Sequence, residues 1–306
     1  MPRIAYFGPS GTFTEMALDQ LESSGAFDGP VERVVAASPP AALAAVRDGS
    51  VEGAVVPIES SVEGPVRPTM DALAAGDRLQ IVAETELDVA FTIVGRPGTD
   101  LADVRTIRAY PVAEAQVRNW IEANLPDAVV ESASSNAGAA EDVAAGRADA
   151  GVSTALASDR LGLAVLAEGV ADFSGARTRF VLVTRPRPVP PATGSDRTSV
   201  VLQLHHEPGS LVGAMAEFST RGIDLTRIES RPTRVEFGTY RFYLDCSGHV
   251  EDSAVAEALK ALHRKHTVRF LGSWATATPG QGRPPSDQEA SGWLERIRGG
   301  EPEGTN

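Results

Sequence analysis

Short aliphatic runs alternate with alanine-rich amphipathic stretches along the first 185 residues of the chain. The aliphatic runs predict strands at residues 3–7, 31–35, 53–57, 129–132, 149–153 and 179–183. The stretches between them predict helices at residues 13–23, 39–49, 112–125 and 136–146. Strand–helix alternation of this kind is typical of an α/β architecture with mainly parallel sheets.

Three of these helices begin with recognisable start signals. Thr12 and Glu15 have the spacing of a capping box, in which each side chain binds the other residue's backbone N–H. Ser38 precedes two prolines that suit the first two positions of a helix. Pro111 is expected to open the helix that carries Gln116.

Residues 78–98 break the alternation, because two extended segments follow one another there without a helix between them. We expect the chain to cross at this point from one α/β lobe into a second. A return crossing near residues 165–180 completes a two-lobed domain over residues 1–185, with a cleft between the lobes.

A different pattern follows a proline-rich segment. Residues 186–197 hold four prolines and little that a core would bury, which predicts a semi-rigid linker. Residues 198–276 then predict the βαββαβ order of a ferredoxin-like module. Its elements are expected at residues 198–204, 209–221, 223–231, 239–246, 252–265 and 267–274. The tail, residues 277–306, is rich in Pro and Gly and offers one short helical candidate around Trp293 and Ile297.

The charge balance limits the possible partners. The chain carries 41 acidic and 28 basic side chains, a formal net charge of −13. This excess leaves no broad basic surface for nucleic acid or for anionic membranes. An anionic small molecule would need a local pocket of Arg side chains and backbone N–H groups. No apolar run approaches the roughly 20 residues that span a bilayer, and the N-terminus shows no leader pattern.

Cys246 is the single cysteine of the chain. An internal disulfide is therefore excluded, and a reducing cytoplasm fits this cysteine usage. Because Cys246 lies in a strand pattern, a small buried hydrophobe is favoured over a reactive thiol.

Polar turns recur where the predicted strands end. GPSGTFTE (8–15) opens a helix whose first N–H groups offer an anion site, although it also suits a simple tight turn. It lacks the G-x-G-x-x-G pattern of a dinucleotide site. VPIESSVEG (56–64) presents Glu59, Ser60 and Ser61 at a strand end, either toward a ligand or as a loop that caps the next helix. Ligands of α/β sheets bind at this edge.

The stretch GARTRFVLV (175–183) places Thr178 between Arg177 and Arg179 at the mouth of a buried strand. The two arginines either form a cationic setting for a hydroxyl or are surface charges on a strand end. Gln116 leaves a similar choice open. By itself it is interpreted as an exposed helix residue, and the alternative is a residue of a ligand site. The recurrence of polar loops at several strand ends of one α/β unit favours a ligand site.

GPSGTFTE, VPIESSVEG and TRF (178–180), in this order and spacing, closely resemble the prephenate dehydratase family. The C-terminal module resembles an ACT domain, with EPGSL (207–211) and ESRP (229–232) similar to its two effector signatures. The resemblance covers residues 3–275 and implies a catalytic domain like a periplasmic binding protein, with a cleft between two lobes. No chorismate mutase segment precedes RIAYF, so the monofunctional form is expected.

The resemblance implies the conversion of prephenate to phenylpyruvate. Prephenate is a dicarboxylate whose ring becomes aromatic when carbon dioxide and water leave. No metal, redox cofactor or covalent nucleophile is expected, because aromatisation drives the reaction. The site must anchor two carboxylates, hold the ring and help the hydroxide to depart.

The resemblance also assigns roles to residues. Thr178 matches the catalytic threonine, which donates a hydrogen bond to the leaving oxygen, an effect typically worth about 3–4 kcal/mol. Arg179 suits a carboxylate, and Glu59 is either an acid, if burial raises its pKa, or an orienting group. The residues expected to bind substrate are Thr12, Ser60, Ser61, Gln116 and Phe180, the last of which packs on the ring or merely starts the strand.

Three positions depart from the family pattern. Ser60 stands where the family has Asn, Tyr110 where it has His, and Ala109 where a Ser is frequent. These differences alter the expected hydrogen-bond network but leave Thr178 and Arg179 in place.

ACT modules commonly pair side by side and bind an amino acid at their interface. The resemblance therefore implies a homo-oligomer, dimer or tetramer, that phenylalanine inhibits. Inhibition requires two enzyme states with different affinity for the effector. The residues expected to bind it are Gly209, Ser210, Leu211, Glu229, Ser230 and Arg231. Without the resemblance, EPGSL reads only as a helix start with Pro208 at the first position.

Three other readings stay open. An arogenate dehydratase would act on the amino counterpart of prephenate. A two-lobed fold with an ACT module also suits a silent amino-acid sensor, against which Thr178, Arg179 and Gln116 speak. A transcription regulator would need a basic helix-turn-helix, and the sequence offers no candidate for one.

Overall fold

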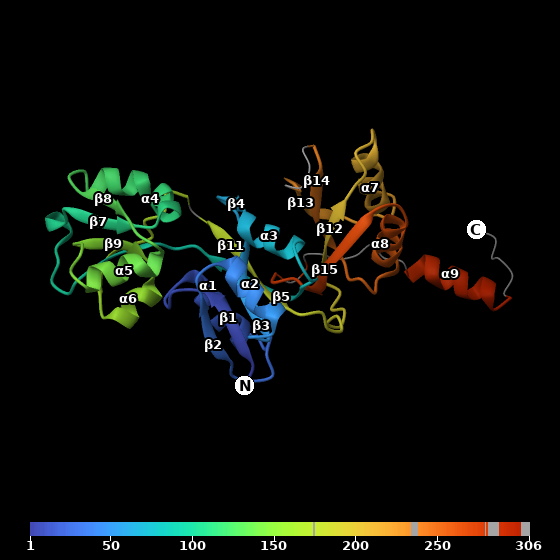
Figure 1. The fold of residues 1–306 in the computed structure, drawn as a ribbon, viewed down its shortest axis with the longest axis horizontal. Helices are drawn as coiled ribbons and strands as arrows, with labels where there is room; N and C mark the ends of the chain where they lie inside the picture. Colours follow the sequence, from blue (N-terminus) through green and yellow to red (C-terminus); the bar gives the residue numbers. More distant parts are fainter. Residues whose placement is uncertain (174, 234–237, 279, 281–287, 301–306) are drawn as a thin grey trace. The chain divides into compact units, whose positions relative to one another are not determined.

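The computed structural model describes residues 1–173, 175–233, 238–278, 280 and 288–300 (Figure 1). The chain divides into two compact units. The first unit comprises Met1–Leu79 and Ala83–Pro186, and the second comprises Gln80–Val82 and Arg187–Asn306. Both units combine helices with sheets, so the predicted α/β class is confirmed. Within the described ranges, no helix has the length and apolarity needed to cross a bilayer.

The first lobe of the first unit is built on strands in the order β5-β11-β3-β1-β2, with β4 beside β3. These strands are β1 (Arg3–Phe7), β2 (Glu32–Ala36), β3 (Gly53–Ser60), β4 (Gly64–Pro65), β11 (Arg177–Thr184) and β5 (Gln80–Asp88), whose residues from Ala83 onward belong to this unit. Its helices are α1 (Phe13–Ser23), α2 (Pro39–Asp48) and α3 (Arg67–Ala74). β1 runs parallel to β2 and β3, whereas β11 runs antiparallel to β3.

Of the start signals predicted for α1 and α2, the structure confirms the one at α2 and contradicts the one at α1. Ser38 caps α2 as predicted, because its side chain accepts a hydrogen bond from the N–H of Ala41. The capping box expected at α1 is wrong. The Thr12 hydroxyl donates to the Phe7 carbonyl, and the Glu15 carboxylate accepts from the N–H of Gly11 rather than of Thr12.

The second lobe of the first unit has a sheet of order β10-β6-β9-β7-β8. Its strands are β6 (Thr92–Gly95), β7 (Thr106–Ala109), β8 (Val129–Ser132), β9 (Ala150–Ser153) and β10 (Ala164–Glu168). Its helices are α4 (Pro111–Asn124), α5 (Asn136–Ala144), α6 (Ala155–Leu161) and the 3-10 turn η1 (Leu101–Asp103). Helix α4 covers one face of this sheet, and α5 and α6 cover the other (Figure 1).

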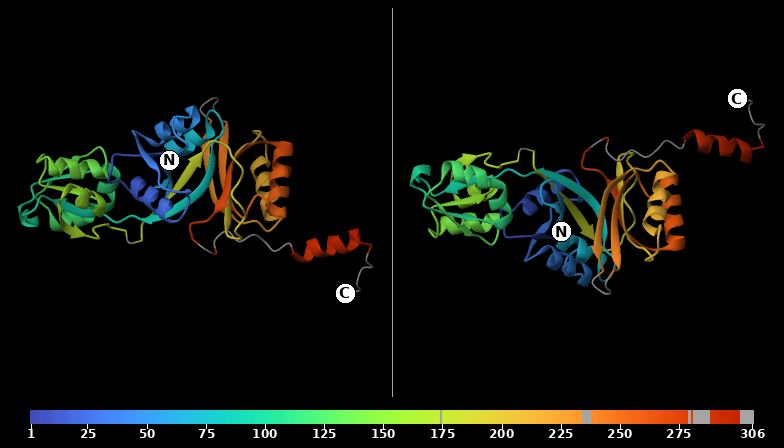
Figure 2. Two further views of the ribbon diagram at one scale, coloured as in Figure 1. Left: turned by 90° about the horizontal axis from the view of Figure 1, so that it is seen from below. Right: turned by 90° about the horizontal axis from the view of Figure 1, so that it is seen from above.

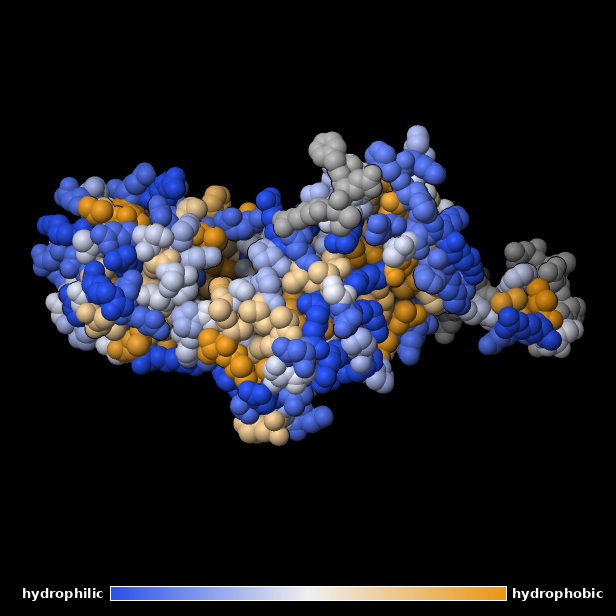
Figure 3. Space-filling model, in the orientation of Figure 1, coloured by the Kyte–Doolittle hydropathy of each residue, from blue (hydrophilic) through white to orange (hydrophobic). Residues whose placement is uncertain are grey.

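The chain passes between the lobes twice. It leaves the first lobe between β5 and β6 without an intervening helix and returns between β10 and β11. Two sheets joined by two crossings form the two-lobed architecture that the sequence predicted. Figure 3 shows a recess in the surface where the two lobes adjoin.

The second unit contains a four-stranded antiparallel sheet of order β13-β14-β12-β15. Its elements are β12 (Asp196–Gln203), α7 (Ser210–Ser219), β13 (Leu225–Pro232), β14 (Tyr240–Ser247), α8 (Ser253–Lys265) and β15 (Thr267–Ala275), the predicted βαββαβ order. Helices α7 and α8 lie on one face of the sheet (Figure 2). Ile81 adds one parallel pairing to Gly272, and α9 (Gln288–Arg298) lies where the tail offered a helical candidate.

Cys246 lies in the core between this sheet and its helices. Its side chain is buried, and burial raises the pKa of the thiol to about 12. A thiol in this state is not a nucleophile near neutral pH. The prediction of a small buried hydrophobe is confirmed.

Candidate active site

Thr178 and Ser60 face each other across neighbouring strands. In the antiparallel pairing of β11 with β3, Thr178 is opposite Ser60 and Arg179 is opposite Glu59. Beyond the pair, the N–H of Ser61 donates to the Arg177 carbonyl at 2.8 Å, and the N–H of Arg177 donates to the Ser61 hydroxyl at 2.9 Å. The structure therefore brings the TRF and ESS segments together, as the sequence predicted.

The turn after β1 emerges at the same edge of the sheet. β1 and β3 are parallel, so both carboxyl ends lie on one side, and the antiparallel β11 begins there. Three polar segments that are distant in sequence thus share one edge on the strands β1, β3 and β11. This edge is where α/β sheets bind ligands.

Thr178 lies at the border between solvent and core. Its side chain is partly exposed, whereas Phe180 is almost fully buried. The register shifts between Arg179 and Phe180, so the strand is irregular at the step from the polar to the apolar positions. The structure places Phe180 in the core, which suits the start of a buried strand.

Arg179 is 5% exposed and is bound by two carboxylates. Its Nη2 lies 2.8 Å from Oε2 of Glu59, and its Nη1 lies 3.2 Å from Oε2 of Glu84. The Glu84 side chain is fully buried, whereas the Glu59 side chain is 38% exposed. The guanidinium is therefore neutralised, with one inner partner and one partner that reaches solvent.

Arg177 is also bound by acidic side chains. Its Nε lies 2.8 Å from Asp88, and its Nη1 lies 3.7 Å from Glu86. The two arginines beside Thr178 thus contact four carboxylates in all. This differs from the cationic setting expected from the sequence, because β5 supplies three acids that neutralise the arginines of β11.

Glu59 lies at the border of the site, as the ion-pair partner of Arg179. Its carboxylate reaches solvent and lies 2.8 Å from the guanidinium of Arg179, so it is not enclosed in an apolar pocket. The sequence left open an acid or a group that orients neighbouring loops, and the contact that the structure shows for Glu59 is with Arg179.

The two serines of the ESS segment stabilise the turn after β3. The Ser60 hydroxyl accepts hydrogen bonds from the N–H groups of Val62 at 3.3 Å and Glu63 at 3.2 Å. The Ser61 hydroxyl accepts from Arg177 across the strands. Both hydroxyls keep a proton that can be donated elsewhere.

Gln116 connects the second lobe to this turn. It is 4% exposed on α4, and its Nε2 lies 3.4 Å from Oε1 of Glu63. Its carbonyl accepts a 2.7 Å hydrogen bond from the N–H of Asp172, whose carboxylate accepts from the N–H groups of Asn119 and Trp120. The segment that returns to β11 thus fixes the helix that carries Gln116.

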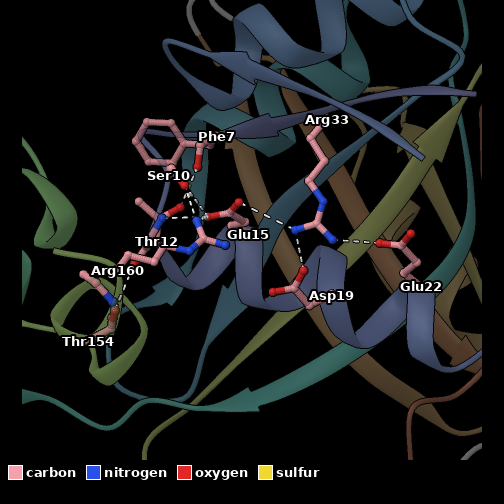
Figure 4. A network of polar contacts seen from close by, with 11 residues as sticks. Phe7, Ser10, Thr12, Glu15, Asp19, Glu22, Arg33, Thr154 and Arg160 are labelled. Carbon is pink, nitrogen blue, oxygen red and sulfur yellow. Dashed lines mark hydrogen bonds and ion pairs between the residues drawn. The ribbon is translucent and has the colours of Figure 1, made fainter. Parts of the chain in front are cut away.

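The start of α1 is occupied by a carboxylate of the chain itself. The Glu15 carboxylate accepts hydrogen bonds from the N–H of Gly11 at 2.6 Å and from the Ser10 hydroxyl at 3.0 Å (Figure 4). Burial opposes its ionisation, but hydrogen bonds from Gly11, Arg160 and Ser10 hold the pKa of Glu15 below its usual value. Thr12 is buried beside it, with its hydroxyl bound to the Phe7 carbonyl.

The expected effector residues form two separate groups in the second unit. Gly209 is the N-cap of α7, with φ +86°, and Ser210 and Leu211 begin the helix. Gly209 and Ser210 line a cavity of about 230 Å³, and Ser210 and Leu211 line another of about 170 Å³. Glu229–Arg231 lie on β13, the edge strand of the four-stranded sheet, and line neither cavity.

Sequence reasoning missed three acidic partners of the site. Glu84, Glu86 and Asp88 alternate along β5, and Arg177 and Arg179 alternate along β11. Alternation with period two places residues on one face of a strand. Acidic residues and arginines that alternate with the same period could therefore have indicated that β5 and β11 lie next to each other in the sheet.

Comparison with known proteins agrees with this architecture. The family model described as prephenate dehydratase matches residues 4–188, and the model of the ACT domain matches residues 198–264. A prephenate dehydratase of Mycolicibacterium smegmatis is 60% identical, over 98% of this chain and 99% of its own. The chain belongs to the prephenate dehydratase family and carries an ACT domain, and the predicted enzyme class is confirmed.

Two solved structures share the fold over most of their length. The prephenate dehydratase of Arthrobacter aurescens in complex with L-Phe is 38% identical with a TM-score of 0.85, covering 97% of this chain and 99% of its own. GqqA, described as a novel type of quorum quenching acylase, is 31% identical with a TM-score of 0.79, covering 90% and 98%. Since proteins of different described activity share the fold, residue roles must be argued from the site.

Proposed function

We propose that this prephenate dehydratase forms phenylpyruvate for phenylalanine synthesis in the cytoplasm, with Thr178 as its catalytic residue. The observation that carries the proposal is the position of Thr178. Its partly exposed hydroxyl lies opposite Ser60, at the sheet edge shared by the three polar segments. The cytoplasmic location is supported by the single cysteine, which is buried.

The reaction needs a hydrogen-bond donor where oxygen departs. The bond between the ring and its carboxylate breaks, and its electron pair enters the ring as carbon dioxide leaves. The carbon–oxygen bond on the opposite side of the ring then breaks with its electron pair on oxygen, which takes up a proton and leaves as water. A neutral threonine is a weak acid, so Thr178 stabilises the developing negative charge instead of transferring its proton fully.

Arg179 is the group best placed to hold a substrate carboxylate. Its planar fork matches a carboxylate, and its inner partner Glu84 fixes it in the core. We infer that a substrate carboxylate takes the place of Glu59, the partner that reaches solvent. This exchange keeps two carboxylates on the buried guanidinium, whereas an additional anion would place a third negative charge beside a single cation.

The remaining polar groups surround this edge. Ser60 and Ser61 lie on the turn after β3, and Gln116 approaches that turn from the second lobe. Thr12 follows the turn after β1 at the same edge. We infer that these side chains orient the second carboxylate and the ring substituents of the substrate.

The test of the catalytic role is Thr178→Ala, compared with Thr184→Ala. Removal of one positioned donor is expected to lower kcat by about 10²–10³, with the melting temperature kept. Thr184 lies at the other end of β11, and its hydroxyl donates a hydrogen bond to the carbonyl of the neighbouring Arg185, so its variant should retain activity. Phenylpyruvate absorbance measures the rate, and prephenate and arogenate are compared side by side. Wild-type turnover by Thr178→Ala would remove this residue from the mechanism.

We propose further that phenylalanine inhibits the enzyme by binding between the ACT domains of two copies. Large apolar side chains are exposed at the start of α7, on β13 and at the start of β14, and they are Leu211, Val212, Ile228 and Tyr240. Exposed apolar surface of this kind supports association with a second copy. Pairing of two copies would bring the Gly209 loop of one to the Glu229–Arg231 strand of the other. The relative from Arthrobacter aurescens was solved with L-Phe.

Gly209→Ala tests the effector site. A side chain is disfavoured at φ +86° by about 1–2 kcal/mol, so the loop should shift and phenylalanine should inhibit at about tenfold higher concentration or more. Ser219→Ala, at the other end of α7, is the control and should be inhibited normally. Sedimentation of Val212→Arg should show loss of the oligomer. If wild-type enzyme neither binds phenylalanine nor loses activity with it, the regulatory proposal fails while the catalytic one stands.

A further inference from the structure

The two lobes of the first unit meet at the turn between β1 and α1. Gly11 has φ +88°, and a Cβ added there would lie 3.1 Å from the Cβ of Ala157 and 3.3 Å from its Cα. The Gly11 carbonyl accepts a 2.9 Å hydrogen bond from the hydroxyl of Thr154, the N-cap residue of α6. Backbone of the first lobe therefore packs directly against Ala157 of a helix of the second.

An ion pair spans the same junction. Arg160, in the last turn of α6, contacts both the Glu15 carboxylate and the Ser10 hydroxyl (Figure 4). Glu15 is almost completely buried, whereas Arg160 is partly exposed. A charge-assisted hydrogen bond to a buried carboxylate is stronger than one between neutral groups. The close approach at Gly11 and the ion pair of Arg160 together form what we call the lobe junction.

A second arginine contacts Glu15 from within the first lobe. Arg33 of β2 lies 3.6 Å from Glu15 and also binds Asp19 and Glu22 of α1 (Figure 4). All of these residues belong to the first lobe. Glu15 thus has one cationic partner from each lobe, and only the Arg160 partner connects the lobes. Removal of Arg160 also leaves Glu15 with a cation nearby, so the variant is expected to fold.

We propose that Arg160 is a positioning residue that fixes the angle between the two lobes through Glu15 and Ser10. The lobes are joined by two chain crossings, a connection typical of domains that close by hinge motion. Gln116 lies on the second lobe, and Thr178 and Ser60 lie on the first. The angle between the lobes therefore sets the width of the site across which substrate binds. The catalytic consequence rests on the proposed function, whereas the structural one does not.

The kinetic test compares Arg160→Met with Arg33→Met, its matched control. Arg160→Met is expected to raise KM about tenfold, the loss of one charge-assisted hydrogen bond, with a smaller change in kcat. Arg160→Lys should recover part of the effect. Arg33→Met removes a similar ion-pair network within one lobe, so it should lower the melting temperature and leave KM unchanged. If both variants raise KM equally, or if neither does, Arg160 is not a positioning residue.

The structural test measures the distance between the lobes. Ala44 on α2 and Ala123 on α4 are exposed, and Cys246 is 2% exposed, so Ala44→Cys and Ala123→Cys accept a pair of spin labels selectively. Pulsed electron paramagnetic resonance should show a broadened or shifted distance distribution in Arg160→Met, and the wild-type distribution in Arg33→Met. An unchanged distribution in Arg160→Met overturns the proposal, whatever the activity. A changed distribution in a chain that does not convert prephenate contradicts the proposed function and leaves the lobe junction standing.

Discussion

Two arginines in different units of the chain are equally buried and both bind carboxylates, but their surroundings differ. In the first unit, Arg179 binds Glu84, which is buried, and Glu59, which reaches solvent. In the second unit, Arg227 binds both oxygens of Asp245, at 2.9 and 2.8 Å, and Asp245 is buried as well. One cluster can therefore exchange a partner with solvent, and the other is closed.

This difference indicates which charged cluster suits a ligand. A buried arginine by itself marks no site, because buried ion pairs also occur as structural elements. What distinguishes Arg179 is an anionic partner that can leave, together with the hydroxyls of Thr178 and Ser60 next to it on the strands. The Arg227 pair has the bidentate geometry of a fixed contact.

Asp245→Asn should have the largest effect on stability. Breaking a buried ion pair by removal of one partner leaves a buried charge uncompensated and costs about 3–5 kcal/mol. The Arg197 guanidinium, 3.8 Å from Asp245, adds to the uncompensated charge. Chemical denaturation measures the free energy of unfolding, and kcat per folded molecule should stay at the wild-type value. A loss below about 1 kcal/mol, the range of exposed pairs, would show that the cluster is not closed.

Glu59→Gln tests the open cluster and should have a smaller effect. If a substrate carboxylate replaces Glu59 at Arg179, removal of the competing charge should lower KM several-fold, about 1 kcal/mol or less, as for partly exposed pairs. Steady-state kinetics with prephenate measure KM, and thermal denaturation should show little change.

Glu84→Gln is the control for this variant, because Glu84 binds the same guanidinium from the buried side. It should lower the melting temperature much more than Glu59→Gln does. A fall in kcat of about 10²–10⁴ in Glu59→Gln is the signature of a general acid. That result would contradict the proposal that a substrate carboxylate displaces Glu59 from Arg179, and it would assign proton transfer to Glu59 instead.

The architecture of both units could be read from the sequence because it depends on local patterns. The βαββαβ order and the crossing at β5 and β6 follow from hydrophobic periodicity within short windows. Helices α3 and α6 were not predicted, because each spans only 8 and 7 residues, too few for a clear period. The edge shared by the three polar segments also followed, since parallel strands place their carboxyl ends together.

The partners of the charged residues could not be read in the same way. Arg160 lies 145 positions from Glu15, and no spacing rule connects them. Glu15 was expected to close a capping box with Thr12, but the contact from the second lobe competes for its carboxylate. The buried ion-pair partner of Arg179, Glu84, likewise comes from β5, which is distant from β11 in the sequence but adjacent to it in the sheet.

Ser60→Asn introduces the residue that the sequence resemblance led us to expect at this position, and it should have the smallest effect. Ser60 accepts hydrogen bonds from the N–H groups of Val62 and Glu63, and an asparagine side-chain oxygen supports the same turn. The fold of the turn and the pairing with Thr178 should therefore persist, and kcat/KM should stay within about threefold of wild type, as for a change that breaks no buried contact. Kinetics with prephenate at several concentrations of phenylalanine measure this. A rise beyond about tenfold, or 1.4 kcal/mol, would mean that an amide at position 60 binds the transition state directly, and that the hydroxyl of this chain does so only weakly. The part of the first unit that binds substrate would then include position 60 on β3 as well as Arg179 on β11. The Arg227 cluster of the second unit would remain a purely structural contact.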